Sequence, residues 1–269
     1  MLGVSRSHYY AQVSSSGTQR KREDQALLVA IKAVFEASDR TYGVNRIRWE
    51  LREQGIFVGK NRICRLMKQH GLRVKTMRRF KVTTNSDHKR AVAPNLVRRN
   101  FTAEAPNRLW TGDITYIWTA EGWLYLAVIL DVFSRRIVGW SMNRRMTDDL
   151  AITAFNNALI RRSPSQGVIF HSDRGSQYCS KRFQSLVKGI GGIQSMSGTG
   201  SCYDNAITES FFGTMKRELV HHCSFERRSE AQSLVFRYIE SFYNLRRRHS
   251  SIGYQAPEEY ERLISKKAV

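Results

Sequence analysis

Three carboxylates occupy positions where they could act together on a phosphodiester. Asp113 lies in an apolar segment that predicts a strand, Asp173 ends a second such segment, and Glu209 lies one turn into a predicted helix. Mg²⁺ prefers oxygen ligands, and two metal ions about 4 Å apart can serve both the attacking and the leaving oxygen. The carboxylates therefore predict a site for two Mg²⁺ ions, for which Mn²⁺ can substitute, with Asp113 bridging them.

Each carboxylate alone is weak evidence, because an isolated Asp at the end of a strand usually serves a turn or a cap. Asp131 is such a case in this chain, and Asp204 is expected to cap the last helix of the core. The triplet is stronger because all three local contexts agree.

The surrounding elements predict how the carboxylates meet. Residues 109–118, 123–133 and 135–142 predict an antiparallel three-strand meander, followed by a helix that Asp148 and Asp149 cap. A strand at 168–173, a helix near 180–188, a strand near 192–196 and a helix from 207 complete the pattern. This order is typical of an α/β fold of the ribonuclease-H kind, a mixed five-stranded sheet with flanking helices. In such a sheet the first and fourth strands are neighbours, so Asp113 and Asp173 should converge, and a helix crossing the edge should bring in Glu209.

The N-terminal part predicts a separate, all-helical domain. Residues 1–24 are interpreted as a mobile basic arm, 25–74 as helix-turn-helix-like, 75–105 as a basic linker, and 106–265 as the catalytic core with C-terminal helices. Two short helices within residues 42–72 leave Arg62, Arg65 and Lys68 on an exposed face suited to DNA. An ordinary helical hairpin with solvated cations is the alternative.

The charge of the chain favours a polyanionic partner. Lys and Arg number 44 against 23 Asp and Glu, a net charge of +21. Nucleic acid is the favoured partner, although ribosomal and membrane-surface proteins share such a balance. The absence of a long apolar run or a signal-like start predicts a cytoplasmic, nucleoid-associated protein without a membrane span.

The cysteines do not predict a zinc site. Cys64, Cys179, Cys202 and Cys223 form no Cys-x-x-Cys pair, and the cluster His221, His222, Cys223 lacks a second ligand pair at zinc spacing. We interpret them as reduced thiols that serve packing.

Several motifs agree in order and spacing with one known group. WTGDITYI, HSDRGSQYCS and CYDNAITESFFGTMKREL resemble the motifs of the bacterial insertion-sequence transposases with an Asp-Asp-Glu, retroviral-integrase-like catalytic core. The nearest resemblance is to the catalytic subunits that are encoded by the second of two overlapping reading frames. YNLRRRHSSIGYQAPEEY, residues 243–260, is similar to the C-terminal signature of that group, and LGVSRSHYYA to its N-terminal part.

The resemblance implies roles for individual residues. Asp113, Asp173 and Glu209 would be the metal-binding catalytic triad, and Lys216 would reach a phosphate near the scissile bond. Contacts with the DNA end are implied for Gln177, Tyr203 and Asn205. Arg248 and His249 would contribute to the closing helix, where a purely structural salt bridge or cap is the equal alternative.

The resemblance also implies partners and a reaction. The partners would be transposon ends, target DNA, a first-reading-frame protein or fusion, and further copies of this chain on DNA. A water would free a 3′-OH, which would then attack a second phosphodiester. Two alternatives remain at this stage, a ribonuclease-H-fold nuclease and a non-catalytic, regulatory DNA-binding protein derived from a transposase.

Overall fold

A computed structural model of the 269-residue chain describes residues 7, 19–75, 92–165, 167–198 and 202–267. The chain divides into two compact units, Met1–Thr76 and Met77–Val269. Each unit is described separately below. The predicted N-terminal arm falls outside the described residues except for Ser7 and residues 19–24, and the latter are helical.

The first unit is a group of three helices. They are α2 (Gln19–Ala37), α3 (Val44–Glu53) and α4 (Lys60–Gln69), and each helix contacts the other two. Their buried apolar side chains recur at helical spacing, as in Leu27, Ile31 and Val34 of α2. Gly55 and Gly71 adopt positive φ just after α3 and α4, which confirms the predicted helix ends.

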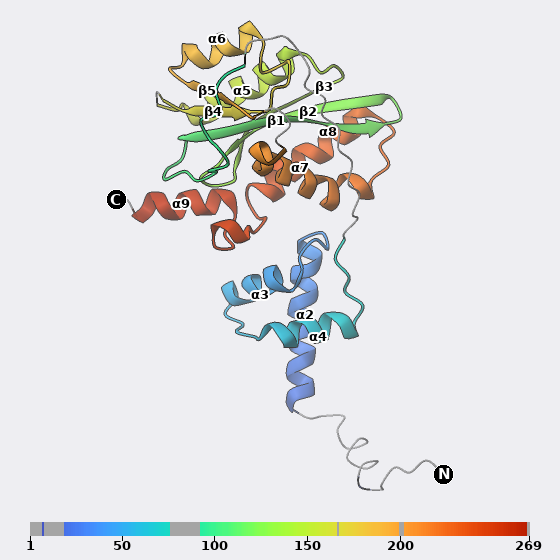
Figure 1. Cartoon of the computed structure of the whole chain (residues 1–269). Coiled ribbons are helices and arrows are strands. Elements are labelled where there is room, and N and C mark those ends of the chain that lie inside the picture. The colour runs from blue at the N-terminus through green and yellow to red at the C-terminus, as the bar shows by residue number, and fades with distance from the viewer. Residues whose placement is uncertain (1–6, 8–18, 76–91, 166, 199–201, 268–269) are drawn as a thin grey trace. The chain divides into compact units, whose positions relative to one another are not determined.

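The second unit is built on one mixed sheet of five strands (Figure 1). The strands are β1 (Leu109–Thr119), β2 (Gly122–Asp131), β3 (Ile137–Asn143), β4 (Ile169–Ser172) and β5 (Ile193–Met196), in the order β3-β2-β1-β4-β5. β1, β2 and β3 are antiparallel, while β4 pairs with β1 and β5 pairs with β4 in parallel. The predicted meander and the neighbouring first and fourth strands are therefore confirmed.

Helices cover both faces of this sheet (Figure 1). Alternate residues of β1 point to opposite faces, so Trp110 packs with α5 (Asp148–Arg162) and α6 (Lys181–Gly189), whereas Leu109 and Ile117 pack with α7 (Ala206–Glu218) and α8 (Arg228–Arg237). Two apolar cores result, one on each side of the sheet.

Several short helical segments and a last α-helix complete the described chain. A short helical segment, η2 (Cys202–Asn205), precedes α7, and η3 (Val220–His222) follows it. A π-helical turn, η4 (Tyr238–Tyr243), extends α8, and η5 (Ser250–Ile252) and α9 (Pro257–Lys267) are the last described elements. No described helix is long and apolar enough to cross a membrane.

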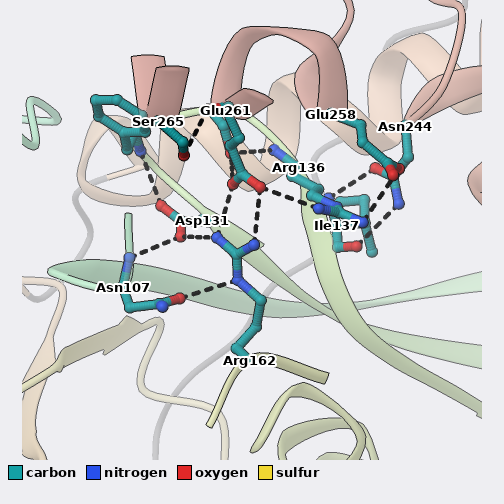
Figure 2. A network of polar contacts seen from close by, with 11 residues as sticks. Asn107, Asp131, Arg136, Ile137, Arg162, Asn244, Glu258, Glu261 and Ser265 are labelled. Atoms are coloured by element: carbon teal, nitrogen blue, oxygen red, sulfur yellow. Dashed lines mark hydrogen bonds and ion pairs between the residues drawn. The ribbon is translucent and has the colours of Figure 1, made fainter. Parts of the chain in front are cut away.

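The C-terminal signature packs on the sheet through a polar network (Figure 2). Asn244 accepts a hydrogen bond from the backbone N–H of Ile137 and donates one to its carbonyl, so its amide replaces a strand partner at the edge strand β3. Arg162 of α5 donates to Asp131 and to both carboxylate oxygens of Glu261 in α9. Asp131 is thus a buried structural carboxylate, as predicted.

Part of the predicted linker lies on the second unit. The Pro94 carbonyl accepts from the Met196 N–H, the Leu96 N–H donates to the Ser195 hydroxyl, and Val97 is buried in the core beside α7. Residues 76–91 lie outside the described residues.

Two capping predictions are wrong. Thr147 is the residue before α5, and the helix start has no side-chain cap; Asp148 and Asp149 instead form ion pairs with Arg182. Asp204 does not cap α7, because Asn205 stands at that position. The Asp204 carboxylate accepts instead from Asn95, Arg99 and the Gly198 N–H, and it ties residues 95–99 to the segment before α7.

Candidate active site

Asp113 and Asp173 are brought together by the pairing of β1 with β4. The parallel register pairs Gly112 with Ser172, so the residue that follows each of them lies at the same place in the sheet. Gly112 has a steric reason to be glycine, because an added Cβ would lie 2.5 Å from the Phe170 ring of β4. The two carboxylates therefore depend on a close approach of these strands.

The segment after β4 is shaped around the Asp173 carboxylate. Its Oδ1 accepts a hydrogen bond of 2.9 Å from the Gly175 N–H. A Cβ on Gly175 would lie 2.9 Å from that oxygen and 3.2 Å from Oε1 of Gln177. Gln177 also donates to the Met146 carbonyl at 3.1 Å. The glycine thus leaves room for the side chains of Asp173 and Gln177, and Gln177 lies near the Asp173 carboxylate.

Glu209 reaches the site from α7. The helix is held against β1 by a buried hydrogen bond of 2.8 Å from the Thr208 hydroxyl to the Thr111 hydroxyl. Glu209, the next residue after Thr208, is exposed. Within the described part of the chain, no three His, Cys, Asp or Glu side chains are grouped closely enough to hold a metal ion. This holds for the triplet Asp113, Asp173 and Glu209 and for the His221–Cys223 cluster.

The three carboxylates nevertheless affect one another. Loss of hydration raises the pKa of Asp113 well above its usual range, the negative charges of Asp173 and Glu209 raise it further, and the Ile114 N–H and Lys216 oppose the rise. Loss of hydration and the charge of Asp173 also raise the pKa of Glu209. Such mutual repulsion is what a divalent cation bound between the carboxylates would relieve.

Lys216 lies beside this acidic group. Partial burial lowers its pKa, while the charge of Asp113 opposes that shift. Its Nζ lies 4.9 Å from the centre of the Tyr116 ring, in a cation–π contact. The predicted cation is therefore at the site, next to both a carboxylate and an aromatic ring.

The remaining predicted DNA contacts are placed less favourably. Asn205 is 3% exposed, and neither atom of its amide has a hydrogen-bond partner among the described residues, so its burial does not support a contact with DNA. The side chain of Tyr203 lies outside the described residues.

The cations of the first unit differ from one another. Arg62 and Arg65 both bind Asp24, at 2.7 and 2.6 Å, whereas Lys68 is exposed. Two of the three side chains predicted on a free face are therefore already engaged within the unit.

One buried ion pair was missed in the sequence. Arg247 binds Glu218, the last residue of α7, through two hydrogen bonds of 2.8 and 2.9 Å, and both side chains are under 10% exposed. Arg248 is also buried, and it donates to the Tyr254 carbonyl. Since these contacts hold the C-terminal segment together, they favour the structural interpretation of the C-terminal signature. The run of three arginines at 246–248 was the available signal.

His171 is a second residue that was missed. Its buried ring bridges the Ser195 hydroxyl, at 2.8 Å, and the Asp204 carbonyl, at 2.6 Å. It joins β4, which leads to Asp173, with β5 and with η2, which leads to Glu209. Its place two residues before Asp173 in the HSD motif was the signal.

Comparisons with known proteins agree with this architecture. Two family models described as integrase core domains match residues 103–202 and 192–257, and an HTH-like domain family matches residues 21–80. The transposase for insertion sequence element IS904 of Lactococcus lactis is 44% identical over 92% of this chain and 98% of its own length. The chain belongs to the insertion-sequence transposases.

The similarity to other relatives of this transposase also covers nearly the whole chain. An uncharacterized 31 kDa protein of insertion element IS600 from Shigella sonnei is 46% identical, covering 98% of this chain and 99% of its own. Transposase InsF of IS3A from Escherichia coli is 42% identical over 97% and 91%. Among solved structures, the intasome of simian T-cell lymphotropic virus in complex with a PP2A regulatory subunit has a TM-score of 0.51 at 16% identity, over 80% of this chain and 70% of that one. That likeness concerns the fold.

Proposed function

We propose that this transposase cuts DNA at the 3′ ends of its insertion sequence and joins them to a second phosphodiester, with Asp113, Asp173 and Glu209 as the catalytic triad. The observation that carries the proposal is that the pairing of β1 with β4 brings Asp113 beside Asp173, while Glu209 and Lys216 of α7 lie close enough to affect the pKa of Asp113. Burial and the charge of Asp173 raise the pKa of both Asp113 and Glu209, and the charge of Glu209 also raises that of Asp113, which supports the proposal.

The residues fit a divalent cation chemically. The donor set is three carboxylates without sulfur, which suits Mg²⁺ or Mn²⁺, and the repulsion around Asp113 would be relieved by positive charge. When bound, two Mg²⁺ ions would polarise the phosphodiester and lower the pKa of the attacking hydroxyl or water. To bind the same pair of metal ions, Glu209 would have to move toward the two aspartates, because the three side chains are not grouped at ligand distance here.

The chain's own residues would supply the remaining steps. Asp113 lies in the central strand β1, and its Oδ1 accepts a hydrogen bond of 2.7 Å from the Ile114 N–H. Lys216 would bind a non-bridging oxygen of the phosphate, and its cation–π contact with Tyr116 would help to position the ammonium. Gln177, beside Asp173, would contact the DNA end.

DNA binding would involve both units. The HTH-like match and the net charge of +21 support contacts outside the catalytic core, with Lys68 as an exposed cation. Transposon ends, target DNA, a first-reading-frame partner and further copies of the chain would complete the active assembly. Because two ends must be joined, we infer at least two copies on DNA.

A strand-transfer assay tests the proposal. Oligonucleotides with the end sequence would be incubated with Mg²⁺ and the wild type, Glu209→Gln, or the control Glu104→Gln, which changes an exposed carboxylate of the same unit. Each reaction would be run with and without the first-frame partner. We expect joined product from the wild type and the control, and a loss of at least a hundredfold in Glu209→Gln. Cut product without joining would favour a nuclease, and DNA binding without any reaction would favour a regulatory protein.

A further inference from the structure

Two tryptophans at the end of the β1–β2 hairpin are exposed. Trp118 and Trp123 are 60% and 42% exposed, although the register places them opposite each other and their rings meet edge to face at 4.7 Å. Large aromatic side chains gain most of their stabilisation from burial. An exposed pair of tryptophans therefore calls for a use other than core packing.

The pair is connected to the active site by a row of contacts. Trp123 meets the Tyr116 ring edge to face at 4.9 Å, and Tyr116 in turn lies under the Lys216 ammonium. The charge of Lys216 interacts with that of Asp113. A continuous series of side chains thus leads from the carboxylate through a cation to an exposed aromatic surface.

The hairpin that carries this surface is firmly anchored. The Thr119 hydroxyl donates to the Gly122 carbonyl, and the Ala120 N–H donates to the Phe225 carbonyl. Arg228, at the start of α8, donates to the carbonyls of Glu121 and Trp123. Cross-strand aromatic pairs can stabilise hairpins, but these contacts already hold this one, so hairpin stability alone does not account for the exposed rings.

We propose that Trp118, Trp123 and Tyr116 form a stacking platform for unpaired nucleobases of DNA next to the phosphate that reacts at the triad. Aromatic side chains beside a cation that tracks the backbone are the usual means of binding single-stranded nucleic acid. The row ends on Lys216, the residue proposed to bind the scissile phosphate, so an occupant would extend naturally from phosphate to base. The inference rests on the proposed function, because it assumes that DNA reaches Asp113.

Fluorescence of 2-aminopurine tests the platform. The full chain, in EDTA so that no reaction occurs, would be titrated with an end-sequence duplex that carries 2-aminopurine in a short unpaired overhang of either polarity, and with a blunt duplex of the same sequence. The variants are Trp118→Ala, the conservative Trp118→Phe, and the control Phe236→Ala, which removes an exposed aromatic side chain of α8. Circular dichroism and thermal melting would show that each variant is folded.

We expect the wild type to quench the overhang probe and to prefer it over the blunt duplex. Trp118→Ala should lose the quenching and bind the overhang duplex more weakly by about fivefold to a hundredfold, because one stacked base contributes about 1–3 kcal/mol. The affinity of Trp118→Ala for the blunt duplex should be close to that of the wild type. Trp118→Phe and Phe236→Ala should quench and bind both duplexes about as the wild type does.

The platform would be overturned if folded Trp118→Ala bound the overhang and blunt duplexes with the affinities of the wild type. It would also be overturned if Trp118→Ala lost the same amount of affinity for the blunt and the overhang duplex. If the protein still joined strands, either of these two outcomes would leave the proposed function intact. Conversely, Trp118-dependent quenching in a chain that never joins strands would support the platform and contradict the proposed reaction.

Discussion

The buried ion pair between Arg247 and Glu218 permits a quantitative prediction, because it fastens the end of the helix that carries Glu209. The two side chains are 6% and 9% exposed, and Glu218 also accepts from the Tyr238 hydroxyl at 2.8 Å. Arg247→Met would leave the carboxylate buried without its cation. Removing one partner of such a pair typically costs about 3–5 kcal/mol of the free energy of unfolding.

Urea unfolding followed by tryptophan fluorescence measures this loss in the correct unit. Four of the five tryptophans, namely 110, 118, 123 and 140, belong to the second unit. The matched control is Arg182→Met, whose ion pairs with Asp148 and Asp149 are formed by an arginine that is 64% exposed. We expect the free energy of unfolding of the control to stay close to that of the wild type, because solvent screens exposed pairs.

The double variant Arg247→Met, Glu218→Gln separates burial from attraction. If the cost of the single variant is mainly an uncompensated buried charge, the double variant should be more stable than Arg247→Met alone. A loss in Arg247→Met no larger than in the Arg182→Met control would refute the reasoning. So would a double variant that loses the sum of both single losses, since the two sites would then be independent.

Three further predictions address the site and its support. Without metal, Asp113→Asn should raise the urea midpoint, because burial and then the charge of Asp173 raise the pKa of Asp113, so that the ionised carboxylate lowers stability at neutral pH. Millimolar Mg²⁺ should stabilise the wild type but not the variant in calorimetry, and the reverse result would contradict the metal assignment. Burial alone would raise the pKa of Glu261, but the hydrogen bonds from Arg162 outweigh burial and lower this pKa below its usual 4.5. The ionised carboxylate should therefore stabilise the fold above about pH 4.5 and lose that contribution as the pH falls. In urea titrations, Glu261→Gln should differ from the wild type more at pH 7 than at pH 4. Gly112→Ala should destabilise the sheet by about 1–3 kcal/mol and reduce strand transfer, because the new methyl group would overlap the Phe170 ring; unchanged stability would show that the ring moves aside without cost.

Much of the core could be predicted from local patterns. Apolar runs around Asp113 and before Asp173 predict two adjacent strands, because a ribonuclease-H-like order leaves few alternative pairings. Helical spacing predicted α7 and the place of Glu209 in its first turn, and both are confirmed. Local chemistry was less reliable at helix ends, where Asp148 and Asp204 bind distant arginines and backbone groups instead of capping.

What the sequence by itself determined is the order of the elements and the family, since both depend on residue types at short spacing: the carboxylates with their flanking motifs, and the alternation of apolar residues. Only the tertiary structure decided which polar groups meet. It buried Asn205, paired Arg62 and Arg65 with Asp24, and made Arg247 the partner of Glu218. It also aligned Lys216, Tyr116 and two exposed tryptophans into one row. Such contacts join segments far apart in the chain, and their partners are selected by packing geometry, which no local pattern of residues specifies.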